Sequence, residues 1–181
     1  MMSLKTNKDN SPLKNKFYRG LWLLCWNIFG IHGPRFLSPI RILLLRTFGA
    51  KINSRVLICS GVKILLPYNL IVEDEVAISE DVTIYNFAMV VIGRNTVISR
   101  GVFLCTGSHD HEKRFFPLIS KPINIGKHVW IAAESFILPG VVIGNSAVIG
   151  ARSVVSKNIL SKKIYAGNPA RVIGTRKIHL P

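Results

Sequence analysis

Residues 125–155 read IGKHVWIAAESFILPGVVIGNSAVIGARSVV, and an aliphatic residue recurs in them at every sixth position. A helix repeats near every 3.6 residues and a plain strand every 2, so this period fits neither. A short strand followed by a turn, with one aliphatic side chain pointing inward on each face, does produce it. Three such faces form one coil of about eighteen residues, and successive coils pair edge to edge. The hexapeptide repeats therefore predict an all-β solenoid, a parallel β-helix.

The same period runs through residues 52–104 in three shorter blocks. It slips by two positions at Leu70–Val72 and again at Val90–Ile92, which predicts local bulges or loop excursions. Between Leu104 and Ile125 it is lost, over the stretch CTGSHDHEKRFFPLISKPIN at 105–124. Loops of this length in a solenoid usually serve a function, and insertions collect on a binding face. We therefore expect the inserted loop around 105–124 to carry the site.

The chain divides into four expected segments: a flexible basic arm at 1–16, a helical N-terminal segment at 17–50, the β-helix at 51–160 and a C-terminal tail at 161–181 that packs on it. Within the helical segment, residues 17–31 are aromatic and apolar, Gly33-Pro34 ends them, and residues 39–48 predict a second short helix. Two interpretations fit these helices. They pack on the main domain or a partner subunit, or they lie in the interface of a membrane with a Lys/Arg fringe.

The chain is strongly basic, with 24 Lys and Arg against 9 Asp and Glu in 181 residues, a formal net charge of +15. A hydrophobic fraction of 49% argues against disorder. The charge gathers at the two ends, with +9 in residues 1–55, −4 in 56–112 and +10 in 113–181. Nucleic acid, an anionic membrane surface and a phosphate-bearing small molecule are the partners that fit such charge.

Several classes of protein lack support in the sequence. No apolar run reaches the roughly 18–20 residues that span a bilayer. The three cysteines lack metal-type spacing, and a cytoplasmic location is expected. No Walker loop, dinucleotide fingerprint, zinc finger or RNA-recognition motif occurs, so we expect no nucleic acid partner.

Four segments carry a resemblance to a known family: RILLLRTFGAKI at 41–52, LLPYNL at 65–70, LCTGSHD at 104–110 and the long segment at 122–173, which ends near AGNPA at 166–170. The chain resembles the hexapeptide-repeat acyltransferases, whose β-helix is left-handed. Within them it is most similar to the colanic acid biosynthesis acetyltransferases, and more distantly to the maltose, galactoside and nodulation O-acetyltransferases. Two positions depart from the family pattern, because Ala132 and Arg152 stand where glycine is usual.

His109 is the leading catalytic candidate. Acyl transfer to a sugar hydroxyl needs a base with a pKa near neutral, and histidine is the usual choice. The resemblance assigns the same role to the histidine of the TGSHD-like segment. Asp110 either orients this base or caps the loop. His111 and Glu112 raise the possibility of a metal site, but neighbouring side chains in an extended loop diverge, so we expect no metal there.

Asn86 and Tyr85 are candidates for binding the acceptor, with Phe87 as a further apolar wall; a corner asparagine is the alternative for Asn86. The resemblance implies a cofactor site in the C-terminal coils, and its matching positions are Trp130, Ala133, Ala151, Ser156, Lys157 and Arg171. Packing is the alternative for Trp130, and ordinary surface charge is the alternative for Lys157 and Arg171.

The resemblance, together with these features, predicts an acetyl-CoA-dependent O-acetyltransferase that acts on a saccharide of a surface polysaccharide, by direct transfer with His109 as general base. The resemblance implies a homotrimer with the cofactor between neighbouring β-helices. A lipid-linked acceptor and contact with the inner face of an anionic membrane are further hypotheses. The alternatives are a metal-dependent hydratase like the γ-type carbonic anhydrases, and a non-catalytic β-helix scaffold.

Overall fold

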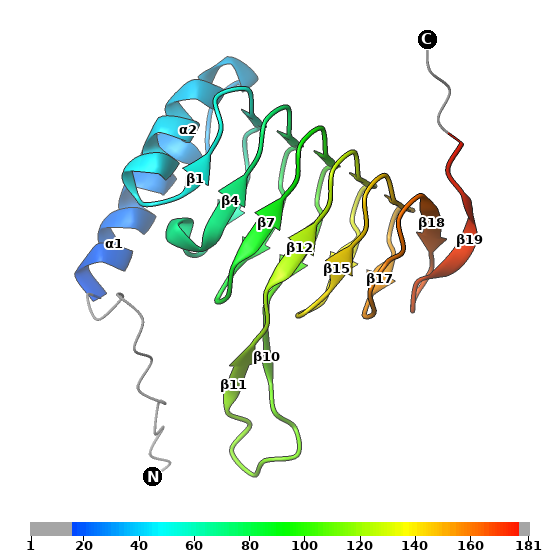
Figure 1. Ribbon diagram of the computed structural model, residues 1–181. Coiled ribbons are helices and arrows are strands. Elements are labelled where there is room, and N and C mark those ends of the chain that lie inside the picture. The colour runs from blue at the N-terminus through cyan, green and yellow to red at the C-terminus, as the bar shows by residue number, and fades with distance from the viewer. Residues whose placement is uncertain (1–15, 178–181) are drawn as a thin grey trace.

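Three sheets of short strands wind around a common axis in the computed structural model, which describes residues 16–177 (Figure 1). Sheet A contains β1 (Lys51–Ile52), β4 (Leu70–Val72), β7 (Val90–Ile92), β12 (Ile123–Ile125) and β15 (Val142–Ile143). Sheet B contains β2 (Leu57–Ile58), β5 (Ala77–Ile78), β8 (Val97–Ile98), β13 (Trp130–Ile131), β16 (Val148–Ile149), β18 (Lys163–Ala166) and β19 (Arg171–Thr175). Sheet C contains β3 (Lys63–Ile64), β6 (Thr83–Tyr85), β9 (Phe103–Cys105), β14 (Phe136–Ile137) and β17 (Val154–Val155). The prediction of a parallel β-helix is confirmed.

The core is the ladder of inward aliphatic side chains that the six-residue period predicts. In sheet B the register stacks Ile58 on Ile78, then Ile98, Ile131 and Ile149, and all five are fully buried. Each such side chain contributes about 1.5–3 kcal/mol relative to exposure to water. Backbone hydrogen bonds join each coil to the next, so the strands need no partner within their own coil.

The turns from sheet A to sheet B and from sheet B to sheet C are all four residues long. Most of them place their third residue in the left-handed region, as Glu134 does at φ 59° and Arg152 at φ 58°. The glycine usual in the family at position 152 suits this conformation, which an L-residue adopts at a cost of about 1–2 kcal/mol. Here Arg152 occupies it, and its Nε donates to the Glu134 carboxylate at 2.6 Å. This ion pair raises the pKa of Arg152. The departure from the family therefore changes a turn on the surface.

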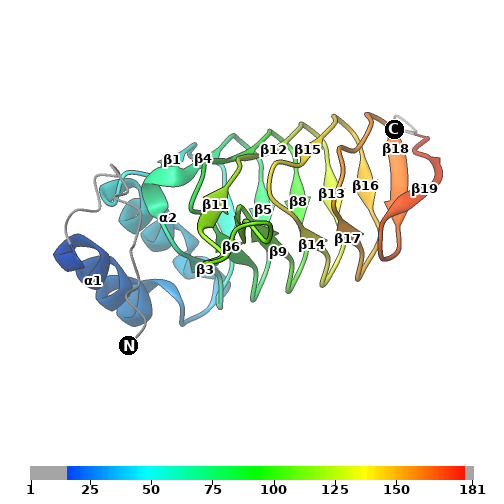
Figure 2. The same cartoon turned by 90° about the horizontal axis from the view of Figure 1, so that it is seen from below.

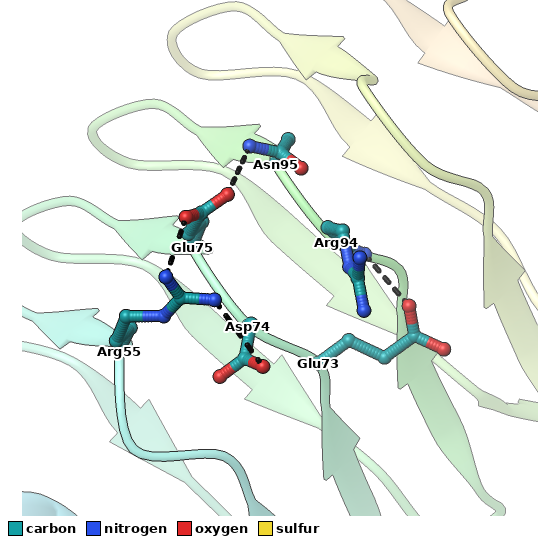
Figure 3. A network of polar contacts seen from close by, with 6 residues as sticks. All are labelled: Arg55, Glu73, Asp74, Glu75, Arg94 and Asn95. Atoms are coloured by element: carbon teal, nitrogen blue, oxygen red, sulfur yellow. Dashed lines mark hydrogen bonds and ion pairs between the residues drawn. The ribbon is translucent and has the colours of Figure 1, made fainter.

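Acidic residues of the middle coils join neighbouring turns on the edge between sheets A and B (Figure 3). The guanidinium of Arg55 lies 3.2 Å from Glu75 and 3.8 Å from Asp74. Glu75 also accepts a bond of 2.6 Å from the Asn95 amide. The groups are exposed, so each pair adds little stability. Their role is local, because each joins one coil to the next.

Helices cover the first coil at the N-terminal end of the solenoid (Figures 1 and 2). They are α1 (Lys16–Cys25), the π-helical turn η2 (Trp26–Gly30), the 3₁₀ turn η3 (Arg35–Leu37) and α2 (Ser38–Thr47), while a further 3₁₀ turn, η4 (Pro67–Asn69), precedes β4. Trp22 and Trp26 stack on each other and donate their indole N–H groups to the carbonyls of Ile64 and Val62. These helices confirm the predicted helical segment at the N-terminal end. The expected arm at 1–16 lies outside the described residues, apart from Lys16.

Arg41 of α2 is fully buried and joins the helices to the β-helix. Its guanidinium donates to the carbonyls of Gly30, at the end of η2, and of His32, Gly33 and Pro34 in the turn between η2 and η3, at 2.7–3.2 Å. A further bond of 3.2 Å reaches the carbonyl of Ile58 in the first coil. A buried charge needs such complete hydrogen bonding to be tolerated. Arg41 therefore fixes the turn and the coil together.

The parallel stacking continues one strand beyond the expected boundary at 160. β18 pairs with β16 in parallel, and β19 returns antiparallel to β18. The turn between β18 and β19 also binds the preceding coil, because the Gly167 N–H donates to Ser153 Oγ and the Ala170 N–H to the Val154 carbonyl. The C-terminal segment thus closes the solenoid instead of only packing against it.

Replacing Arg41 tests its role in the cap. Arg41→Met should lower the free energy of unfolding by about 3 kcal/mol or more, because it leaves several buried carbonyl groups without donors. Urea-induced unfolding followed by circular dichroism measures the change. Arg19→Met is the matched control, because Arg19 is exposed on α1. Equal stability of the two variants would contradict the role given to Arg41.

Candidate active site

Every irregularity of the hexapeptide period falls where the chain passes from sheet C into sheet A. The insertion lies on the edge between these sheets, and the two slips lie in β4 and β7, which directly follow that edge. This long edge consists of residues 65–69, 86–89, 106–122, 138–141 and 156–158. The two slips and the large insertion, which are far apart in the sequence, are therefore stacked in neighbouring coils. The insertion forms an antiparallel hairpin of β10 (Gly107–His109) and β11 (Leu118–Ser120) that projects from the solenoid (Figure 1).

His109 ends β10, with its side chain exposed to solvent. Its Nδ1 lies 2.5 Å from the carbonyl oxygen of Phe116 in the hairpin loop. A carbonyl oxygen only accepts, so Nδ1 carries the proton in the neutral ring. This bond leaves the lone pair on Nε2 and fixes the direction in which the ring faces. The arrangement is the one that a general base requires.

Asp110 follows His109 but binds the hairpin loop. Its carboxylate accepts from the backbone N–H of Glu112 at 3.2 Å and lies 3.2 Å from Lys113 Nζ. Its own N–H donates to the carbonyl of Pro117. These contacts are those of a loop cap, the alternative interpretation of this residue. The group that orients His109 is the Phe116 carbonyl, which no side-chain pattern in the sequence indicates.

An aromatic wall stands at the base of the hairpin. Tyr85 is 38% exposed and makes an edge-to-face contact with Phe87, with ring centroids 4.8 Å apart. Gly107 leaves room for both rings, because a Cβ there would lie 2.7 Å from Phe87 and 3.6 Å from Tyr85. The structure thus places these two aromatic residues beside the strand that carries His109.

Asn86 is fully buried, in contrast to the prediction that it lines the acceptor site. Its amide donates to the carbonyls of Leu66 and Asn69 and accepts from the Leu66 N–H. These bonds occupy the side chain in turning the corner of the coil. One coil further on, Thr106 is also fully buried, and its hydroxyl bonds Tyr85 and Ala88. This is the role of a corner asparagine, the alternative interpretation of Asn86.

Two cavities follow the long edge from the hairpin to the C-terminal end. The first, of about 230 Å³, is lined by Ser108, Ile119, Ser120, Lys121, Leu138, Pro139 and Ser156. The second, of about 380 Å³, is lined by Ser156, Lys157, Arg171 and neighbours from β17 to β19. Ser156 lines both, so the two cavities adjoin and are together called the groove. The first includes Ser108, next to His109, and the second includes the exposed cationic side chains of Lys157 and Arg171. The sequence pattern did not indicate Ser108 or Lys121.

The other predicted cofactor positions lie elsewhere on the chain. Trp130 projects from sheet B, is 48% exposed and donates its indole N–H to Ser99 Oγ at 3.0 Å. Ala133 and Ala151 lie in the turns from sheet B to sheet C. Sheet C separates these turns from the long edge. A single chain therefore presents two separate sets of the predicted positions.

Residues 16–177 lack two further features. They contain no cluster of three or more His, Cys, Asp or Glu side chains arranged to hold a metal ion. Over the same residues, no helix combines the length and apolarity needed to cross a membrane.

Comparison with known proteins extends these observations. Residues 122–157 match the family model "Bacterial transferase hexapeptide (six repeats)". The chain is 42% identical over 155 residues to the "Putative colanic acid biosynthesis acetyltransferase WcaF" of Escherichia coli (strain K12), covering 86% of this chain and 85% of that protein.

Solved structures also match. A galactoside acetyltransferase in complex with coenzyme A superimposes with a TM-score of 0.76 at 30% identity, covering 87% of this chain and 80% of the other. A maltose O-acetyltransferase from Clostridium difficile 630 gives 0.78 at 26% identity, covering 89% and 87%. The protein belongs to the hexapeptide-repeat acyltransferases and is an acetyltransferase, related to those of colanic acid biosynthesis.

Packing at the hairpin base can be tested with one methyl group. Gly107→Ala should lower the free energy of unfolding by about 1–3 kcal/mol, because the new Cβ overlaps the Phe87 ring. Gly20→Ala is the matched control, since a Cβ there meets nothing within 4 Å and alanine favours the helix. Thermal unfolding compares them. A Gly107→Ala protein as stable as the Gly20→Ala protein would show that the hairpin base is not tightly packed.

Proposed function

We propose that the protein transfers an acetyl group from acetyl-CoA to a hydroxyl group of a saccharide used in surface-polysaccharide biosynthesis. The observation that carries this proposal is the geometry of His109, whose Nδ1 bonds the Phe116 carbonyl and whose Nε2 is free to accept a proton. The relatives named for colanic acid and galactoside acetylation support the class of acceptor.

The proposed reaction is a direct transfer. His109 Nε2 takes the proton of the acceptor hydroxyl as its oxygen attacks the thioester carbonyl carbon. The carbon–sulfur bond then breaks, and the leaving thiolate takes the proton from the imidazolium. No acyl-enzyme forms, so both substrates must be bound together. Tyr85 and Phe87 are proposed to form an apolar wall for the sugar ring.

The donor is proposed to lie along the groove of the long edge. Lys157 and Arg171 flank its far cavity, and such side chains bind phosphate groups through charge-assisted hydrogen bonds. The excess of basic residues in 113–181 favours a polyanionic ligand over a neutral one. Trp130, Ala133 and Ala151 are proposed to contact the same cofactor from a neighbouring chain.

A homotrimer would bring the two sets of cofactor positions together. In a closed ring of three copies, the long edge of one chain faces another edge of the next. Each cofactor would then lie between two chains, with His109 from one and Ala133 and Ala151 from the other. A cytoplasmic enzyme at the inner face of the membrane would meet lipid-linked acceptors there.

Replacing His109 separates chemistry from binding. His109→Ala should lower the rate of coenzyme A release with saccharide acceptors by about 10²–10⁴-fold, the usual contribution of a general base. The rise in thermal midpoint caused by acetyl-CoA should stay unchanged, because a ligand of the folded state stabilises it by mass action. His111→Ala, two residues further along the exposed loop, is the matched control.

Full activity of His109→Ala would overturn the mechanism. If acetyl-CoA leaves the midpoint of the wild type unchanged and zinc copurifies stoichiometrically, the hydratase alternative replaces the proposal.

Removing the cationic side chains tests the donor site. Lys157→Ala and Arg171→Ala should each weaken acetyl-CoA binding by about tenfold, through the loss of charge-assisted bonds to phosphate. Lys127→Ala is the control, because Lys127 is exposed in a turn between sheets A and B. Isothermal titration with acetyl-CoA measures the affinities. Equal affinities of the three variants would place the donor elsewhere.

Mixing variants tests the shared site. A solution mass three times the 20.2 kDa of one chain is expected. His109→Ala and Ala151→Glu should each be inactive, and coexpression of the two should restore part of the activity, because some sites then combine an intact long edge with an intact neighbouring turn. No restoration in mixed trimers would show that each site belongs to one chain.

A further inference from the structure

The N-terminal helices carry an apolar stripe that is exposed to solvent. Phe17, Leu21, Leu24 and Ile28 recur at spacings of four, three and four along α1 and η2, and are 76%, 41%, 58% and 57% exposed. Trp22 and Trp26, on another side, pack on the first coil. This segment is therefore apolar toward solvent as well as toward the core, which an ordinary surface helix is not.

The second helix repeats this arrangement. Phe36 in η3 and Ile40 and Leu43 in α2 follow the same spacing and are 77%, 50% and 65% exposed. Ile42 and Leu45 of α2 face the core. An open cavity of about 830 Å³ lies beside Leu43, between α2 and the first coil, with Phe36 and Pro39 among its lining residues. Both outward faces belong to the helices that cover one end of the solenoid (Figures 1 and 2).

The surroundings of this surface are basic. Residues 16–72 contain eight Lys and Arg and no Asp or Glu. Arg19 and Arg35 are exposed beside the apolar stripes, and Arg46 lines the cavity. Exposed apolar side chains with a basic fringe match a bilayer whose headgroups are anionic. A second copy of this end would set two such basic surfaces against each other, so charge disfavours that occupant.

We propose that the helical end of the molecule binds the surface of an anionic lipid bilayer through the apolar stripes of α1, η2 and α2. The apolar side chains enter the boundary between headgroups and acyl chains, and the arginines contact lipid phosphates. α1 has ten residues, about half the number needed to cross a bilayer, so it lies in the interface. The proposal rests on the proposed function in one respect, the purpose of binding, which is to bring the enzyme to lipid-linked acceptors. Binding itself requires neither His109 nor acetyl-CoA.

Flotation of the full chain with lipid vesicles tests the proposal. The vesicles contain phosphatidylcholine alone, or phosphatidylcholine with phosphatidylglycerol. The protein should float with the anionic vesicles at low salt, and each arginine that contacts the surface should contribute about fivefold to the affinity. Raised salt should weaken the binding, because it screens exposed charges.

Absence of flotation with anionic vesicles at low salt would overturn the proposal. Equal flotation with both vesicle compositions would also overturn it. Neither result would affect the acetyl-CoA midpoint test.

Leu24→Glu and Leu43→Glu should each weaken vesicle binding by more than about tenfold, because each replaces an inserted apolar side chain by a charge. Ile173→Glu on β19, at the opposite end of the solenoid and 66% exposed, is the matched control and should float like the wild type. Acetyl-CoA should raise the thermal midpoint of all three variants equally, which shows that they are folded.

Flotation of both leucine variants like the control would overturn the assignment of the surface. A smaller solution mass for Leu24→Glu or Leu43→Glu would show instead that the face joins copies of this chain.

Discussion

Each coil of the molecule is held by the coils before and after it, through backbone hydrogen bonds between parallel strands. This pairing forces the inward side chains into columns, since Ile131 must lie on Ile98 and below Ile149. A column tolerates neither a polar side chain nor a change of register, because its members are fully buried. Extra residues must therefore leave the solenoid at a corner. Two corners keep their four-residue turns throughout, and all the variation falls on the third.

The concentration of variation on one edge creates the candidate site. The hairpin of 107–120 leaves the solenoid there, and the rigid coils on both sides fix its base. Thr106 binds that base to the preceding coil through backbone and hydroxyl bonds. His109 therefore lies on the hairpin but close to these rigid coils. Such support would hold its ring in place for the proposed reaction.

The two ends of a solenoid expose unpaired strand edges and an open core, and this chain closes each end differently. At the N-terminal end two indoles and the buried Arg41 satisfy the carbonyls of the first coil. At the C-terminal end β18 and β19 form an antiparallel pair, and Tyr165 of β18 covers the last residues of the core. Protected edges prevent pairing with other chains. The N-terminal closure leaves its own outer face apolar, which is why a further partner is inferred there.

The hexapeptide period by itself determined the fold, because only a three-faced coil repeats every six residues. It also located the insertion and, with the resemblance, indicated His109, Lys157 and Arg171. It did not show that both slips and the insertion adjoin one edge, since that follows from how coils stack in space. Only the tertiary structure showed that Asn86 is buried, that Asp110 caps its loop and that a carbonyl group orients His109. Periodicity reports which side chains face inward. Hydrogen-bond partners contributed by a distant backbone have no such signal in the sequence.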